Sequence, residues 1–287
     1  MNITKIGKIC GDQDGAVFSD FLFRFNASGD YSVYNLKNLD FSMDNGDVAP
    51  IYSGKLDRFS EIVPHSNATF FGSNYYEDGD EFPILYSNLY NNYANDETKN
   101  ALLLCYRVKR DGSDFTTSLI GEIKIGFKDE RNFWRSSIGE DVRPYGNFVS
   151  DKNSSKLYAF VMIDKENITR YFSFNMPDIN KGEMNEVLGI KSITLNKSDI
   201  IECFDAPYHR YIQGGCLKEN NIYSTEGFSN DAVQIPAIRI ISTEGKEQIK
   251  YVNLPEYGYY EEPEFIDFYG DICLYSDAHG NLYRIIW

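Results

Sequence analysis

The chain has 287 residues, a formal net charge of −15 and a sequence pI of about 4.7. No run of Lys or Arg provides the basic face of a nucleic-acid-binding protein, so this composition excludes a nucleic-acid partner. An acidic chain is repelled by anionic membranes, and no apolar run reaches the roughly 18 residues of a spanning helix, so we expect no membrane insertion.

The first ten residues, MNITKIGKIC, resemble a strand and lack the apolar core of a signal peptide. We therefore expect a cytoplasmic protein if Met1 is its natural start. A secreted or periplasmic protein is expected if a leader has been removed.

Short apolar or alternating runs recur between turns rich in Asn, Asp, Gly and Ser, which is typical of strands and hairpins. The abundance of Tyr (22) and Phe (20) also favours strands. The only helical pattern is INKGEMNEVLGI, residues 179–190, which predicts one or two helical turns.

Five segments share one pattern: polar residues, a short strand, a tight turn and a second strand. In four of them the second strand carries a hydrophobic residue followed by Tyr, in ILYS, KLYA, NIYS and CLYS. The segments span residues 13–25, 65–88, 145–161, 212–228 and 263–277. Repeats of roughly 45 to 50 residues with loop insertions are typical of the blades of a β-propeller.

The last segment predicts strands near residues 265–269, 272–276 and 281–286 and lacks a fourth strand. The strand-like residues 3–10 precede the first complete segment and can supply it. We predict a single all-β domain over residues 1–287, a five-bladed β-propeller closed by an N-terminal strand that completes the last blade. Six blades, or one or two β-sandwiches, are the alternatives.

The strands in NSSKLYAF, ENNIYST and GDICLYSD resemble the repeated strand of the NHL and YVTN-like β-propeller superfamily of bacteria. The resemblance covers nearly the whole chain. It implies a fold, and no catalytic residue can be carried over from it.

Polar residues precede the innermost strand of each predicted blade, and these positions converge at one end of a propeller channel. They are Asp12, Gln13 and Asp14; His65, Ser66 and Asn67; Arg143, Tyr145 and Asn147; Tyr208, His209, Arg210, Tyr211 and Gln213; and Glu261, Glu262 and Glu264. As ligand-binding candidates we choose His65, Asn67, Arg143, Tyr145, His209, Gln213 and Glu264.

These residues predict a non-catalytic binding propeller, a monomer, that recognises a small molecule, glycan, peptide or protein at the channel mouth. Tyr faces stack on such ligands, while Asn, Gln and His orient them by hydrogen bonds. A glycoside hydrolase that uses Asp14, Asp205 and Glu264 is one alternative. A protein-interaction scaffold is another, and a channel lining that only binds water is the simplest explanation.

We expect no cofactor and assign no metal. The acidic turns at residues 12–15 and 77–81 hint at calcium loops, but neither completes the calcium-binding pattern. A zinc site at His65 and His209 would need a third ligand. The third histidine, His279, lies in the predicted hairpin tip SDAHGN, where we expect it to be solvated.

Overall fold

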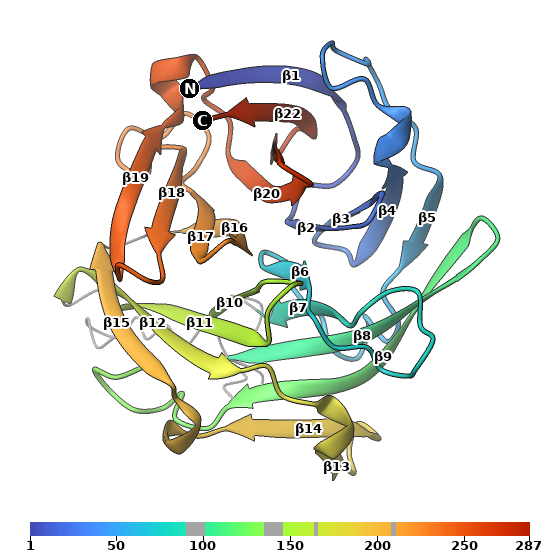
Figure 1. The fold of residues 1–287 in the computed structure, drawn as a ribbon, viewed down its shortest axis with the longest axis vertical. Helices are drawn as coiled ribbons and strands as arrows, with labels where there is room; N and C mark the ends of the chain where they lie inside the picture. The colour runs from blue at the N-terminus through green and yellow to red at the C-terminus, as the bar shows by residue number, and fades with distance from the viewer. Residues whose placement is uncertain (90–100, 135–145, 164–165, 208–210) are drawn as a thin grey trace.

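Five β-sheets arranged in a ring make up the fold in a computed structural model, which describes residues 1–89, 101–134, 146–163, 166–207 and 211–287 (Figure 1). The predicted five-bladed propeller is confirmed. The chain contributes its sheets in order around the ring, and the first strand of each lies nearest the centre (Figure 1).

Each blade is built on an antiparallel meander of four strands. In blade 3, β13 and β14 intervene in the chain before the fourth strand, and in blade 5 the fourth strand is β1. Blade 1 contains β2 (Gly15–Phe18), β3 (Phe21–Phe25), β4 (Asp30–Asn35) and β5 (Tyr52–Lys55). Blade 2 contains β6 (Thr69–Phe71), β7 (Leu85–Leu89), β8 (Leu102–Asp111) and β9 (Asp114–Ile125). Blade 3 contains β10 (Asn147–Ser150), β11 (Lys156–Ile163), β12 (Ile168–Asn175) and β15 (Glu202–Pro207).

Blade 4 contains β16 (Ile212–Lys218), β17 (Asn221–Glu226), β18 (Ala237–Ser242) and β19 (Glu247–Asn253). Blade 5 contains β20 (Pro263–Tyr269), β21 (Ile272–Asp277), β22 (Asn281–Ile286) and β1 (Asn2–Lys8). The helical elements of the described residues are short 3₁₀ turns: η1 (Leu36–Asn38), η4 (Ile179–Lys181), η5 (Lys197–Asp199) and η6 (Leu254–Tyr257). None of them is long and apolar enough to cross a membrane.

The repeated Tyr lies on the second strand of blades 2 to 5, where it is buried in blades 2, 3 and 5 and partly buried in blade 4. Tyr86 stacks on Phe70 with ring centroids 5.1 Å apart, and Tyr275 stacks on Tyr283 at the same separation. Both tyrosines are fully buried. The pattern is therefore a packing feature, because each ring removes a large apolar area from water.

The N-terminal strand closes the ring, as predicted. β1 pairs antiparallel with β22, with Asn2 opposite Ile286 and Lys8 opposite Asn281. Closure of this kind leaves β22 without an unpaired edge.

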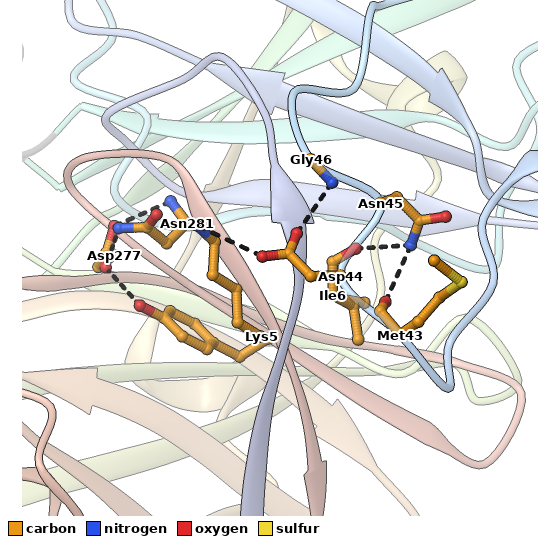
Figure 2. A network of polar contacts seen from close by, with 9 residues as sticks. Lys5, Ile6, Met43, Asp44, Asn45, Gly46, Asp277 and Asn281 are labelled. Atoms are coloured by element: carbon orange, nitrogen blue, oxygen red, sulfur yellow. Dashed lines mark hydrogen bonds and ion pairs between the residues drawn. The ribbon is translucent and has the colours of Figure 1, made fainter.

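The loop between β4 and β5 of blade 1 covers the other edge of β1 (Figure 2). The sequence did not predict this contact. The main-chain N–H of Asn45 donates to the Ile6 carbonyl at 3.0 Å, and its side-chain amide donates to the same oxygen at 2.6 Å. The main-chain N–H of Lys8 donates to the Gly46 carbonyl at 2.8 Å, and the Lys5 Nζ lies 3.8 Å from the Asp44 carboxylate. The closing strand is thus held from both sides.

The helix predicted over residues 179–190 is wrong. This segment forms η4, then β13 (Glu183–Asn185), a turn, and the start of β14 (Ile190–Leu195). The Asn185 side chain closes the turn by accepting the N–H groups of Val187 and Leu188, and Gly189 has a φ of 63°. β14 then pairs in parallel with β9, so strand pairing outweighs the helical spacing and blade 2 becomes six-stranded.

Candidate functional site

The starts of the inner strands meet at the axis of the propeller, and Asp14 connects three of them. Its carboxylate Oδ2 accepts the N–H of Thr69 at 2.9 Å and the N–H of Gly215 at 3.4 Å. Blades 1 and 4 are not neighbours in the ring, so this side chain reaches across the channel. Asp14 is fully buried.

Asn67 makes a second connection across the ring. Its side-chain amide donates to the carbonyl of Ile212 at 3.1 Å, from blade 2 to blade 4. Next to it, the hydroxyls of Ser66 and Ser87 lie 2.9 Å apart. At this depth the channel is therefore crossed by buried polar side chains.

Gly214 of β16 is the reason that the strands approach so closely. A Cβ atom at this position would lie 2.5 Å from the Glu264 carbonyl oxygen and 2.9 Å from Asp14 Oδ1. Contacts this short force a shift of the backbone or of the carboxylate. Glycine at 214 thus leaves room for the Glu264 main chain and the Asp14 carboxylate.

Several buried atoms of this layer have no hydrogen-bond partner among the described residues. They are Gln13 Oε1, Asp14 Oδ1, Arg24 Nε and Nη1, Asn67 Oδ1, Asn147 Nδ2 and Glu264 Oε2. Each unsatisfied buried group costs roughly 1–3 kcal/mol, so such groups bind water or a ligand.

Arg24, on β3, belongs to this layer and was missed by the sequence analysis. It is fully buried, donates from Nη2 to the Gly11 carbonyl at 3.1 Å and lies 4.9 Å from the centre of the Phe265 ring. Burial lowers the pKa of Arg24 to about 10, against the attraction of Asp14 and Glu264. The signal in the sequence was a single cation inside the apolar run FLFRF.

The two acidic residues of the layer hold their protons unusually strongly. Burial raises the pKa of Asp14 well above its usual range, although N–H donors such as that of Thr69 oppose the shift. Burial also raises the pKa of Glu264, and the nearby charge of Glu262 adds to the effect. A carboxyl group that keeps its proton can donate as well as accept a hydrogen bond.

Further polar residues surround this layer, among them Gln213, which is 9% exposed. Gln213 donates its side-chain amide to the Gly227 carbonyl at 3.4 Å and to the carboxylate of Glu262. His65 and Tyr211 are partly exposed, and the Tyr211 ring lies 4.4 Å from the ring of Phe228.

The structure brings Asp14, Asn67 and Glu264 together in the buried layer, with Gln213 at its rim. His65 lies two residues before Asn67 and is partly exposed. Arg143, Tyr145, Tyr208, His209 and Arg210 lie outside the described residues. His279 is exposed in its hairpin tip, as expected, and lies 3.1 Å from the Glu261 carboxylate.

Asp205 does not belong to this site, and its choice as a channel carboxylate is wrong. It lies on β15, the outer strand of blade 3, and binds Arg170 through two hydrogen bonds of 2.7 and 2.9 Å. The inner strand β16 begins only at Ile212, so position 205 belongs to the preceding strand.

Three of the four acidic residues in the turn at residues 77–81 pair with arginines. Glu77 and Asp80 pair with Arg107, and Glu81 pairs with Arg110. Within the described part of the chain, no three His, Cys, Asp or Glu side chains come together as a metal site would require.

No family model and no curated protein matches the chain. Among solved structures, glutaminyl cyclase of Myxococcus xanthus is similar with a TM-score of 0.49 and 10% identity, over 99% of this chain and 93% of that one. Hydrazine synthase of Kuenenia stuttgartiensis has a TM-score of 0.41 and 13% identity, over 91% of this chain and 60% of that one. BamB of Moraxella catarrhalis has a TM-score of 0.33 and 9% identity, over 96% of this chain and 57% of that one. These similarities transfer no activity and no site residue.

Proposed function

We propose that this chain is a non-catalytic binding propeller that recognises a small polar ligand at the mouth of its channel. The observation that carries the proposal is the set of unpartnered buried atoms where the inner strands begin, above all Asp14 Oδ1, Asn67 Oδ1 and Glu264 Oε2. A protein keeps such costly groups where a bound molecule or ordered water satisfies them.

The chemistry of these atoms favours a ligand with hydroxyl groups. The layer offers oxygen acceptors at Asp14, Asn67 and Glu264 and a nitrogen donor at Asn147 Nδ2. A hydroxyl group donates one hydrogen bond and accepts two, so it can serve both kinds of partner. A carbohydrate therefore fits best, followed by a peptide or a protein segment with exposed amides.

The ligand would lie on the outer side of the buried layer, because Asp14 and Asn67 already span the channel. There the aromatic pair of Tyr211 and Phe228, with ring centroids 4.4 Å apart, would contact the ligand. His65 precedes β6 and Gln213 lies at the start of β16, and both would orient the ligand.

A thermal-shift screen of neutral mono- and oligosaccharides and short peptides tests this proposal, with isothermal titration calorimetry on each hit. We expect His65→Ala and Gln213→Ala to weaken binding at least about tenfold, the effect of losing roughly 1.4 kcal/mol. His279→Ala is the matched control, since this histidine is exposed in a hairpin tip. The proposal fails if nothing in the screen binds, or if all three variants bind equally well.

A glycoside hydrolase is the second candidate, favoured by the raised pKa values of Asp14 and Glu264. A carboxylic acid that keeps its proton near neutral pH suits general-acid catalysis. Turnover of aryl glycosides that disappears in Glu264→Gln would establish this activity in place of simple binding. The protein-interaction scaffold is a third hypothesis, with a protein segment as its ligand.

We also propose kinship with the NHL and YVTN-like superfamily. Its support is the hydrophobic-Tyr strand, which recurs as β7, β11, β17 and β21.

A further inference from the structure

A cavity lies at blade 2, and none of its lining residues belongs to the channel site. It measures about 430 Å³, within the range of pockets that bind small molecules. The connection before β6, strands β8 and β9 and the turn between β13 and β14 enclose it. The lining residues are Glu61, Ile62, Leu102, Glu122, Lys124, Asn185, Val187 and Leu188.

One wall of this cavity is apolar. Ile62 and Leu102 belong to the hydrophobic cluster between blades 1 and 2, and Leu188 packs against that cluster. Val187, at the tip of the turn, is 92% exposed. Ile62 and Leu102 are only 2% and 5% exposed, so an apolar body in the cavity would cover mainly Val187 and Leu188.

The other wall carries Glu122, a charged residue that is only 2% exposed. Its Oε1 accepts hydrogen bonds from Asn185 Nδ2 at 2.9 Å and Ser192 Oγ at 3.0 Å, and lies 2.6 Å from Lys124 Nζ. All three partners in the described part of the chain are on Oε1, which leaves Oε2 as an unused acceptor on a residue that lines the cavity.

The charges around the cavity are balanced. Lys124 neutralises Glu122, and Arg58 neutralises Glu61 through a hydrogen bond from Nε at 3.0 Å. A charged head group would therefore enter without a free counter-ion and would lose its hydration. A neutral hydroxyl needs no counter-ion, because it can donate to Glu122 Oε2 and accept from Lys124 Nζ.

The walls are also held in place before any ligand binds. Asn185 joins them, because its Nδ2 donates to Glu122 while its Oδ1 closes the turn at Val187 and Leu188. Arg58 Nη1 fixes the same turn by donating to the Leu188 carbonyl at 2.6 Å. Because these side chains are already ordered, a ligand that binds here would lose little free energy to ordering them.

We propose that this cavity binds a small neutral amphipathic alcohol, with its hydroxyl at Glu122 and Lys124 and its apolar body against Val187 and Leu188. The proposal is independent of the channel site. Either site can be correct without the other.

The test uses hexan-1-ol as the probe, with hexylammonium and hexanoate as charged comparators of similar size. Ligand-observed NMR and calorimetry on the full chain should show that the alcohol binds at least about tenfold more tightly than either ion. Absence of alcohol binding, or equal binding of one of the ions, would overturn the proposal.

Two variants locate the site. Val187→Asp places a charge beside the apolar wall at an exposed position and should weaken alcohol binding at least about tenfold. Val233→Asp, at a valine that is 80% exposed on blade 4, is the matched control and should leave binding unchanged. Leu188→Trp, which would fill the cavity, should abolish binding. Unchanged binding in both Val187→Asp and Leu188→Trp would contradict the assignment.

Discussion

The carboxylate of Asp14 accepts the N–H of Thr69 at 2.9 Å, which ties the start of β2 to the start of β6. The same oxygen accepts the N–H of Gly215 on the far side of the ring. One side chain thus satisfies donors from two other blades. This makes Asp14 a structural centre of the propeller as well as part of the proposed binding site.

Replacing Asp14 by Ala should destabilise the fold by about 2–4 kcal/mol, because the N–H groups of Thr69 and Gly215 lose their acceptor. Asp14→Asn keeps one carbonyl oxygen and should cost less. Urea unfolding followed by circular dichroism measures both variants. Equal stability of Asp14→Ala and the wild type would show that these contacts do not hold the blades together.

Gly214→Ala should also be destabilising, by about 1–3 kcal/mol, because a packed interior resists added atoms. Its Cβ would lie 2.5 Å from the Glu264 carbonyl oxygen. Gly245→Ala is the control, since the nearest atom to its Cβ would be 3.3 Å away on a side chain. A thermal melt in which the two variants behave alike would contradict the close approach at the axis.

The stability of the closing strand β1 should depend on Asn45, which donates two hydrogen bonds to it. Asn45→Ala removes the side-chain hydrogen bonds to Ile6 and to the loop itself and should cost about 1–2 kcal/mol. Lys5→Ala removes only a partly exposed ion pair at 3.8 Å and should cost less than about 1 kcal/mol. Deleting residues 1–10 should lower Tm further, because it exposes the edge of β22. A truncated chain with an unchanged Tm would refute closure by β1.

Stability should fall as the pH rises, in part through Glu264. Its pKa is raised in the folded protein, so the native state keeps a proton that the unfolded chain releases above a pKa of about 4.3. The native state therefore binds more protons in this window, and the free energy of unfolding decreases with pH until the folded pKa is passed. Glu264→Gln should flatten this decrease at pH values above the pKa of the unfolded chain.

The control is Glu247→Gln, at an exposed position on β19, which should follow the wild-type curve. Urea unfolding at several pH values provides the comparison. If Glu264→Gln and the wild type give parallel curves, Glu264 does not retain its proton in the folded state.

Much of the fold was predictable because it follows from local pattern. The alternation of strands and turns indicated five blades, with six as the alternative, and the missing fourth strand after residue 286 indicated closure by β1. The pairing of β14 with β9 was not predictable, since Lys191 and Gly121 become partners across a long stretch of chain. No local feature of residues 179–190 indicated the pairing of β14 with β9.

The candidate site was predictable at its centre and not at its edge. Asp14, Asn67 and Glu264 precede or begin inner strands, so the repeat alone indicated that they converge. Arg24 was missed because it lies on a second strand and reaches the site only through its long side chain. Asp205 was misplaced because two adjacent strands of different blades, β15 and β16, were not separated in the sequence.

A high-resolution crystal structure of the protein with a hit from the carbohydrate and peptide screen tests the central claim most directly. Our account predicts ligand density at the channel mouth, with donors to Asn67 Oδ1 and Glu264 Oε2 at hydrogen-bonding distance. Ordered water alone on those two atoms, with the hit bound elsewhere or absent, would contradict it.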